Sequence, residues 1–439
     1  MFHFSYSSLL SLNMKIRKIG YLVLAKDNNL MSFRYIDLCA GIGGFHQAMK
    51  LLGGVCVGAA EVNDSCIKTY QTNFPTTTML GDITDKNIQF NIPTFDLVCA
   101  GFPCQPFSKA GKQLGFEDKS RGKLFFSILD IIDAHPEAKG FIFENVRNLA
   151  DNKKNWSIIC DELKKRDFII TEEPLILSPS DFGIPQKRER VFILGIRQRD
   201  RDQRALPNSR ITEDDLDLYK KSCGSKAAFS ILDKNTDNAF AVTPNVEEAL
   251  FAWDEFRSKT GIKTIGFPIW LSHFGIGIDR DSNFFEMMDI DQMPTWKQNY
   301  LKHNRHFYQL HRNFIDDWII RYHMLDRSKL LQKFEWNCGT DASDIKHGLI
   351  QIRQSGVRVK RPDLFPTLVA MPNTPIIWDD SMGHFRRITP KEAAKLQSFD
   401  LDYRFNESDN QTYRQLGNAV NVEIARQLGR GLLRLMRKE

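Results

Sequence analysis

The chain has 439 residues, of which 42% are hydrophobic and 26% are charged, a globular composition with room for two or three domains. The formal net charge of +6 permits a polyanionic partner without proving one. The eight cysteines form no CxxC pair and no zinc-ligand spacing, and no apolar run is long enough to cross a membrane. The sequence therefore disfavours a disulfide scaffold, a metal site and a membrane protein, and we expect a reduced, cytoplasmic protein.

The first 30 residues contain two short apolar runs with lysines and arginines between them, which is not the pattern of a signal peptide. The true start is open between Met1, Met14 and Met31, and Met31 lies directly before the first expected strand. We expect residues 1–30 to be a dispensable extension.

From residue 33 onwards, strand-like and helix-like segments alternate. This alternation predicts an α/β fold with a doubly wound, mostly parallel sheet. We expect strands at 33–38, 55–61, 77–80, 95–100, 140–144, within 167–177 and at 190–196, and helices at 45–52, 65–73 and 122–134.

The pattern changes at a charged linker, residues 199–204. The following region, to about residue 386, lacks the strand–helix alternation and is rich in aromatic residues and histidines, so we expect a second, smaller and irregular domain. Thr389 and Pro390 predict the start of a helix that ends near Phe399, and a long amphipathic helix is expected at 420–437.

A glycine-rich turn, residues 39–44, joins the first strand to the first helix. Glycines there let the backbone approach a ligand, and the helix N-terminus offers free N–H donors. Glu61 ends the next strand, where a carboxylate commonly binds ribose hydroxyls, and Asp82 ends the third strand. The pattern predicts a nucleoside-bearing cofactor, either NAD or S-adenosylmethionine. It is not GxGxxG, which disfavours a dinucleotide.

Cys104 follows the strand at 95–100, in a turn that Pro103 and Pro106 restrict. Such a cysteine is a candidate covalent nucleophile. Glu144 ends the neighbouring strand and is expected to face it. A carboxylate raises the pKa of a nearby thiol, so we expect Glu144 to serve the substrate instead, for example N3 and the amino group of a cytosine ring.

Residues 186–190 precede the strand at 190–196, so Gln186, Arg188 and Arg190 are expected to alternate onto one face. Two guanidinium groups on that face suit a base carbonyl and backbone phosphates, and a solvated charged edge is the alternative interpretation.

Together these motifs resemble those of bacterial DNA (cytosine-5)-methyltransferases of the restriction–modification type. The resemblance implies a Rossmann-like catalytic domain, a target-recognition domain, and a C-terminal segment that completes the catalytic domain. The expected boundaries are 31–199, 200–400 and 401–439. The matching blocks are 37–45, 81–83, 101–105, 144–146, 186–190, 387–399 and 415–420.

The resemblance also implies site residues. Cys104 would attack carbon 6 of the cytosine, Glu144 would activate the ring, Arg190 would contact the base, and Arg188 would lie nearer the DNA backbone. The S-adenosylmethionine residues would be Asp37, Cys39, Gly41, Gly43, Gly44, Phe45, Glu61, Val62, Asp82, Ile83, Pro103, Leu124, Asn418 and Ala419. The DNA-binding residues would be Gln105, Ser108, Gln186, Arg358, Lys360 and Thr367.

Carbon 5 would then attack the cofactor methyl group and lose its proton. The target base must leave the duplex for this reaction, and residues 108–116 would form the loop that closes over it. The chain departs from the family pattern at Cys39, Val62, Ala419 and Asp400, where many relatives carry Phe, an aromatic residue, Ser and Pro.

Two basic segments of the second domain are candidates for DNA contact. Residues 296–308 combine cations with aromatics. They form either a phosphate-binding segment or an amphipathic helix with a packed aromatic face. Residues 355–361 form a basic loop, with Arg358 or Lys360 expected to reach a guanine.

The sequence thus predicts a monomeric enzyme that methylates double-stranded DNA in the bacterial cytoplasm, at the nucleoid, as the protective methylase beside a cognate restriction endonuclease. An RNA cytosine-5 methyltransferase and a non-catalytic DNA-binding homologue are the alternatives. The DNA recognition sequence is not readable from the chain.

Overall fold

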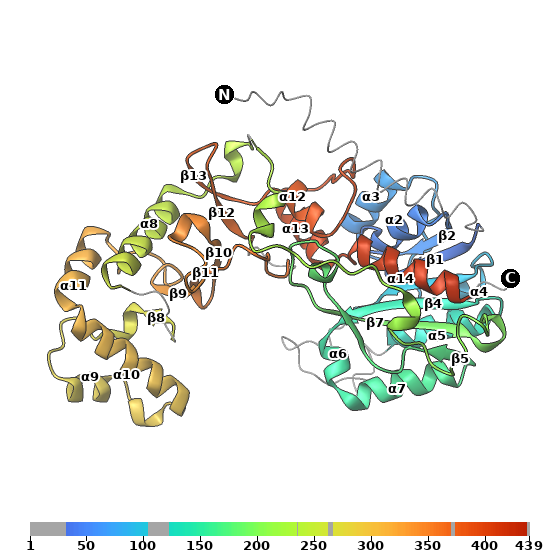
Figure 1. Cartoon of the computed structure of the whole chain (residues 1–439), viewed down its shortest axis with the longest axis horizontal. Coiled ribbons are helices and arrows are strands. Elements are labelled where there is room, and N and C mark those ends of the chain that lie inside the picture. Colours follow the sequence, from blue (N-terminus) through green and yellow to red (C-terminus); the bar gives the residue numbers. More distant parts are fainter. Residues whose placement is uncertain (1–31, 104–122, 235, 262–266, 370–373, 437–439) are drawn as a thin grey trace.

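The computed structural model describes residues 32–103, 123–234, 236–261, 267–369 and 374–436. These residues form two lobes, each built around one β-sheet (Figure 1). Among the described residues, no helix is long and apolar enough to cross a membrane.

The first sheet has seven strands, in the order β2-β1-β3-β4-β7-β5, with β6 paired to β7. The strands β1 to β4 pair in parallel, whereas β5, β6 and β4 all run antiparallel to β7. The α/β prediction is confirmed, but the sheet is mixed. Between β5, β6 and β7 no crossover helix intervenes, and only antiparallel strands can be joined by such short connections. The strands are β1 (Arg34–Leu38), β2 (Val55–Ala60), β3 (Leu97–Gly101), β4 (Gly140–Val146), β5 (Phe168–Ile170), β6 (Leu175–Leu177) and β7 (Arg190–Arg197).

One predicted strand, 77–80, is not part of this ladder. Met79 forms only an isolated parallel bridge with Ala59, and Gly81, with φ 86°, turns the chain directly afterwards.

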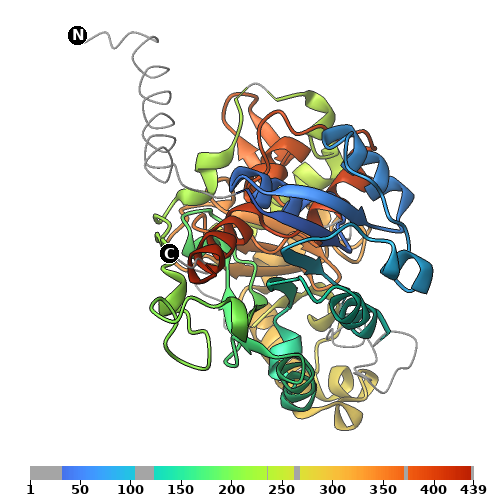
Figure 2. The ribbon, with the colours of Figure 1, turned by 90° about the vertical axis from the view of Figure 1, so that its right-hand side faces the viewer.

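Helices cover both faces of the first sheet. One face packs against α2 and α14, and the other against α5 and α7 (Figure 2). The predicted helices are found with ends shifted by one or two residues. The helices of this lobe are α2 (Gly44–Leu51), α3 (Asp64–Asn73), α4 (Lys86–Phe90), α5 (Lys123–Ala134), α6 (Asn148–Asp151), α7 (Lys153–Lys164), α12 (Pro390–Leu396), α13 (Asp409–Asn418) and α14 (Val422–Leu435).

The second lobe is more regular than predicted, because it contains a six-stranded sheet in the order β13-β12-β10-β11-β9-β8. Its apolar face and its helices share one core, which includes Trp253, Trp318 and Phe334. The strands are β8 (Ile269–Trp270), β9 (Lys333–Asn337), β10 (Leu349–Arg353), β11 (Gly356–Lys360), β12 (Ile376–Asp379) and β13 (His384–Arg387), and the helices are α8 (Pro244–Lys259), α9 (Asp281–Met287), α10 (Thr295–Leu310) and α11 (Arg312–Arg321).

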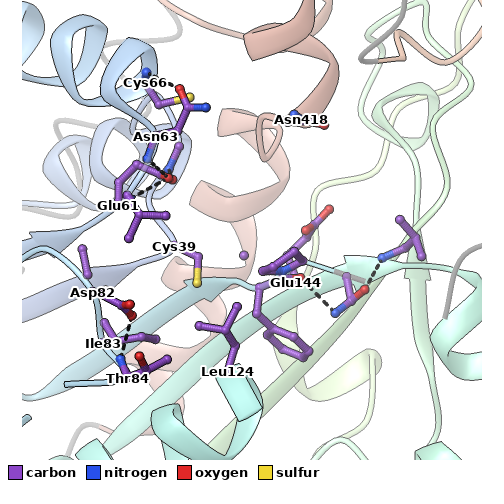
Figure 3. A pocket seen from close by; sticks show the side chains of 18 of the residues that line it. Cys39, Glu61, Asn63, Cys66, Asp82, Ile83, Thr84, Leu124, Glu144 and Asn418 are labelled. Carbon is purple, nitrogen blue, oxygen red and sulfur yellow. Dashed lines mark hydrogen bonds between the residues drawn. The ribbon is translucent and has the colours of Figure 1, made fainter. Parts of the chain in front are cut away.

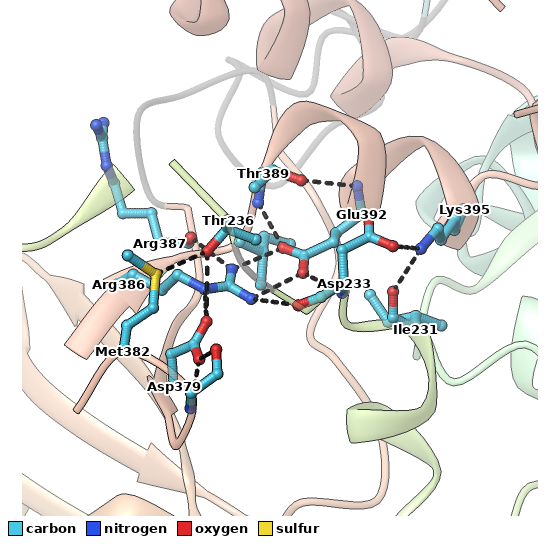
Figure 4. A network of polar contacts seen from close by, with 12 residues as sticks. Ile231, Asp233, Thr236, Asp379, Met382, Arg386, Arg387, Thr389, Glu392 and Lys395 are labelled. Carbon is cyan, nitrogen blue, oxygen red and sulfur yellow. Dashed lines mark hydrogen bonds and ion pairs between the residues drawn. The ribbon is translucent and has the colours of Figure 1, made fainter. Parts of the chain in front are cut away.

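A buried polar network joins β12 and β13 to α12 (Figure 4). The guanidinium of Arg386 donates to Asp379 and, through two nitrogens, to Glu392. Thr389 caps α12 as predicted, in a capping box with Glu392. Buried ion pairs therefore join the second sheet to α12, a helix that packs on the first lobe.

Candidate functional site

A cavity of about 790 Å³ opens where β1 to β4 end, a size and position typical of ligand sites in such sheets (Figure 3). Many of the predicted site residues line it: Cys39, Gly41, Glu61, Val62, Asp82, Ile83, Pro103, Leu124, Glu144, Arg188, Arg190 and Asn418. The strand ends thus bring together the cofactor and base-activation residues that the sequence predicted separately.

The glycine-rich turn is shaped by close packing on one side and open space on the other. A side chain at Gly43 would lie 2.6 Å from the Phe74 ring, and one at Gly44 would collide with the Val420 carbonyl oxygen. Gly41, with φ 55°, has no atom within 4 Å of where a Cβ would be. The turn therefore leaves room for a ligand at Gly41, while Phe74 and Val420 pack against it at Gly43 and Gly44.

Glu61 is fixed by the backbone. One carboxylate oxygen accepts from the N–H of Gly41 at 2.9 Å, and the other accepts from Val62 and Asn63 at 2.8 and 2.9 Å. These bonds tie the glycine-rich turn to the end of β2. They hold the carboxylate at the cavity, where it can still accept from ribose hydroxyls.

Asp82 lies across the cavity from Cys39 (Figure 3). Its carboxylate accepts from the N–H of Thr84 at 2.9 Å, which closes the turn after Gly81. Ile83 and Leu124 add apolar surface. A cavity with two carboxylates and apolar walls fits the adenosyl part of S-adenosylmethionine.

Five predicted cofactor residues do not line the cavity: Asp37, Gly43, Gly44, Phe45 and Ala419. Phe45 is buried in the core of the first lobe. Asp37 is fully buried, and burial raises the pKa of its carboxyl well above the ordinary value. These residues support the turn from behind.

Glu144 is a buried carboxylate in the cavity, near the end of β4. Its side chain is 10% exposed, and its Oε1 lies 3.0 Å from Nε of Arg190. Burial raises the pKa of Glu144, and the nearby guanidinium groups of Arg190 and Arg188 oppose that rise without cancelling it. The net effect is a pKa above that of an exposed glutamate, which favours the protonated form of this carboxyl relative to an exposed one. Asn145 braces the strand end by donating to the Phe102 carbonyl at 3.2 Å.

Arg188 is placed differently from the expectation. Its side chain is buried and donates to the carbonyl oxygens of Leu368, Gly417 and Ala419 at 2.9, 2.9 and 3.1 Å. These bonds direct the guanidinium inward, towards two chain segments, rather than towards a DNA phosphate. Gln186 is also fully buried, so the two residues do not share an exposed face with Arg190.

The other predicted DNA-binding residues lie on two connected segments. Thr367 donates to the Lys187 carbonyl at 2.7 Å. Arg358 and Lys360 belong to strand β11, not to a loop, and Arg358 pairs with Glu335 at 2.6 Å. Residues 296–308 lie in helix α10, whose inner face is packed around Leu301 and Tyr308, as the amphipathic interpretation predicts. Cys104, Gln105 and Ser108 lie outside the described residues.

Several lining residues were not predicted: Ala60, Asn63, Cys66, Thr84, Lys123, Asn145 and Gly417. Asn63 has a readable signal, because an Asn directly before a helical pattern is a typical N-cap, and its side chain accepts from the N–H of Cys66. Its position two residues after Glu61 then puts it at the same strand end.

The fold and the cavity define an α/β protein with a ligand site at the strand ends, where Glu61, Asp82 and Glu144 meet. The sequence profile of the C-5 cytosine-specific DNA methylase family matches residues 33–434, and the chain belongs to this family. It is a DNA cytosine-5 methyltransferase, and its cofactor is S-adenosyl-L-methionine.

Individual relatives agree along nearly the whole chain. The type II methyltransferase M.DsaV of Dactylococcopsis salina is 41% identical, over 91% of this chain and 86% of that protein. M.AluI of Cellulosimicrobium cellulans is 29% identical, over 90% of this chain and 91% of that protein. A putative DNA modification methyltransferase encoded in an E. coli prophage has the same fold, with a TM-score of 0.51 and 21% identity over 92% of this chain and 99% of that one.

Proposed function

We propose that this chain is the protective methylase of a restriction–modification system and methylates one cytosine in a short sequence of double-stranded DNA through a covalent adduct with Cys104. The observation that carries the proposal is the position of Glu144, buried beside Arg190 in the same cavity as the cofactor residues Glu61 and Asp82. The type II methyltransferases to which the chain is similar support the assignment to restriction–modification.

Glu144 has the chemistry to activate a cytosine. Its carboxyl donates to N3 when protonated and accepts from the exocyclic amino group, which makes carbon 6 electrophilic. Burial raises the pKa of this carboxyl, which favours protonation relative to an exposed glutamate, and Nε of Arg190 lies 3.0 Å from its Oε1 and fixes the side chain. Arg190 can also donate to the carbonyl oxygen of the base.

The Cys104 thiolate forms a bond to carbon 6, and the electron pair of the C5–C6 double bond becomes available at carbon 5. Bound S-adenosyl-L-methionine supplies an electrophilic methyl group. After methyl transfer, the proton at carbon 5 is removed, the C5–C6 double bond re-forms and the cysteine leaves. Because the ring is inaccessible in stacked DNA, the target cytosine must be extruded into the cavity.

The domain organisation follows the two hydrophobic cores. The catalytic domain comprises residues 31–199 and, after the second lobe, the C-terminal segment from 401 to 439. The target-recognition domain lies between them, and its own core contains residues from 249 to 385. Residues 206–228 and 388–399 pack into the core of the first lobe, which supports narrower limits for the recognition domain than 200–400. We further propose that the protein acts as a monomer at the bacterial nucleoid, on the same sequence as a separate restriction endonuclease.

Bisulfite sequencing of plasmid DNA from cells that express the chain or its Cys104→Ala variant tests the proposal. We expect protected cytosines within one short recurring sequence, and none with the variant. Protection that persists in Cys104→Ala would refute the covalent mechanism. If the folded, cofactor-binding protein protects no cytosine, the RNA methyltransferase or the non-catalytic homologue replaces this proposal.

A further inference from the structure

One face of the second sheet packs on the lobe's own core, and the other is charged along β9 and β11 but apolar at Leu349 and Ile377, which pack into the core of the first lobe. On β9, β10 and β11, the residues Phe334, Ile350, Val357 and Val359 belong to the hydrophobic core of the lobe. Side chains alternate along a strand, so their neighbours point to the opposite face. The register pairs Arg358 with Gln351 on one side and with Glu335 on the other. We call this surface the polar sheet face; it comprises Trp270, Lys333, Glu335, Gln351, Arg353, Arg358 and Lys360.

The polar sheet face carries four cations and one carboxylate, Glu335. The cations lie close enough to disturb one another: burial and then the charge of Arg358 lower the pKa of Arg353, and burial and the charges of Arg353 and Arg358 lower the pKa of Lys360. Such crowding is unfavourable in the free protein and is relieved by an anionic ligand.

The same face holds buried polar atoms that lack a partner. Among the described residues, Oε1 of Gln351, Nε of Arg353 and Nε1 of Trp270 accept or donate no hydrogen bond. Gln351 is only 1% exposed. A buried amide oxygen without a partner is costly, so the polar groups of this face are incompletely satisfied in the free protein.

The backbone connects this face to the methylation site. After β11, Phe365 pairs with the segment that begins at Gln186, and its carbonyl accepts from the N–H of Lys187 at 2.9 Å. Lys187 contributes to the positive field at Lys360. Three residues after Lys187, Arg190 contacts Glu144 in the cavity. Cations therefore extend from the polar sheet face to the base-activating carboxyl.

We propose that the polar sheet face reads the bases next to the target cytosine, and that Arg358 and Glu335 exchange their mutual ion pair for the two bases of one G·C pair. Arg358 has the geometry to donate to guanine O6 and N7, and Glu335 accepts from the cytosine amino group. The ion pair at 2.6 Å holds both side chains in place before DNA binds. This inference rests on the proposed function and names its specificity residues.

Methylation rates on short duplexes test the proposal. The wild-type target, found by bisulfite sequencing, is compared with duplexes in which each neighbouring base pair is changed singly. We expect Arg358→Gln and Glu335→Gln to reduce discrimination at the same single base pair by about tenfold or more, as loss of a bidentate base contact does. The control is Arg321→Gln on helix α11, which removes a cation from an exposed ion pair with Glu255 and is expected to leave discrimination unchanged.

Thermal unfolding and cofactor binding of each variant should match those of the wild type. These two measurements distinguish a loss of base discrimination from a loss of folding. Unchanged discrimination in both variants would overturn the proposal, as would a uniform loss of rate on all duplexes, which would assign the face to phosphate binding. Failure of the proposed function gives a different result, since the wild-type protein itself would then methylate no duplex.

Discussion

The buried charge network between the lobes provides the strongest stability prediction. Arg386 and Glu392 are 1% and 0% exposed, and Nη1 and Nη2 of Arg386 lie 2.8 and 2.9 Å from the two oxygens of Glu392. Its Nε also lies 2.6 Å from Asp379. Substitution by leucine would leave two buried carboxylates without a cation. Breaking a buried ion pair in this way costs about 3–5 kcal/mol, a large share of the ~5–15 kcal/mol by which a domain is stable.

The penalty of Arg386→Leu should depend on pH. Burial raises the pKa of Asp379, but the hydrogen bond from Ser381 and the Arg386 guanidinium outweigh this, so the pKa is lowered in the wild type. The wild-type contribution is therefore present above the unfolded pKa of about 4 and lost as the pH falls through the folded pKa. In the variant, burial without the Arg386 cation raises the pKa of Asp379, and acid relieves the penalty.

Urea unfolding followed by tryptophan fluorescence at several pH values measures both effects. We expect a free energy of unfolding lower by about 3–5 kcal/mol at pH 7.5 and a smaller difference at pH 5. Arg387→Leu is the matched control, because within the described part of the chain the neighbouring guanidinium makes one long hydrogen bond, of 3.5 Å, to the Ala239 carbonyl. A penalty that is absent, or that does not change with pH, would refute the reasoning.

Four further predictions concern substitutions in the first lobe. Glu61→Gln should weaken S-adenosyl-L-methionine binding about tenfold in calorimetry, because a charged acceptor becomes neutral, without loss of DNA binding. Glu144→Gln should lower the methylation rate at least about 100-fold at unchanged cofactor affinity, measured in single-turnover assays. Gly44→Ala should lower the unfolding free energy by about 1–3 kcal/mol, since the new methyl group meets the Val420 carbonyl oxygen. Burial lowers the pKa of His46 from 6.5 to about 3. The free energy of unfolding should therefore fall as the pH drops below 6.5, and this fall should be smaller in His46→Gln.

Much of the catalytic lobe was predictable, because its signals are local. The glycine-rich turn, the carboxylates at strand ends and the capped helix at Thr389 each depend on a few consecutive residues, and the structure brings Glu61, Asp82 and Glu144 to one cavity. The direction of β7 was not predictable in this way, because a buried apolar run reads the same in a parallel and an antiparallel ladder.

The site residues show a second limit of sequence analysis. A motif combines residues that touch a ligand with residues that hold the motif in place, and the pattern does not separate them. Gly41 faces the cavity, whereas Gly43 and Gly44 are required by the packing of Phe74 and Val420 behind the turn. Asp37 and Phe45 belong to the same block and are buried beneath it.

The segment from Gln186 to Arg190 contacts both the cavity and the chain that leads from the second sheet. Arg188 turns inward and binds carbonyls of the 365–369 segment and of the end of α13, so it holds the two chain segments that flank the cavity. Arg190 is directed to Glu144, and the backbone of Lys187 is bonded to Phe365, just after the polar sheet face. A shift of the second sheet would therefore move the partner of the base-activating carboxyl. With the roles proposed for the polar sheet face and for Glu144, this one short segment joins base reading to base activation.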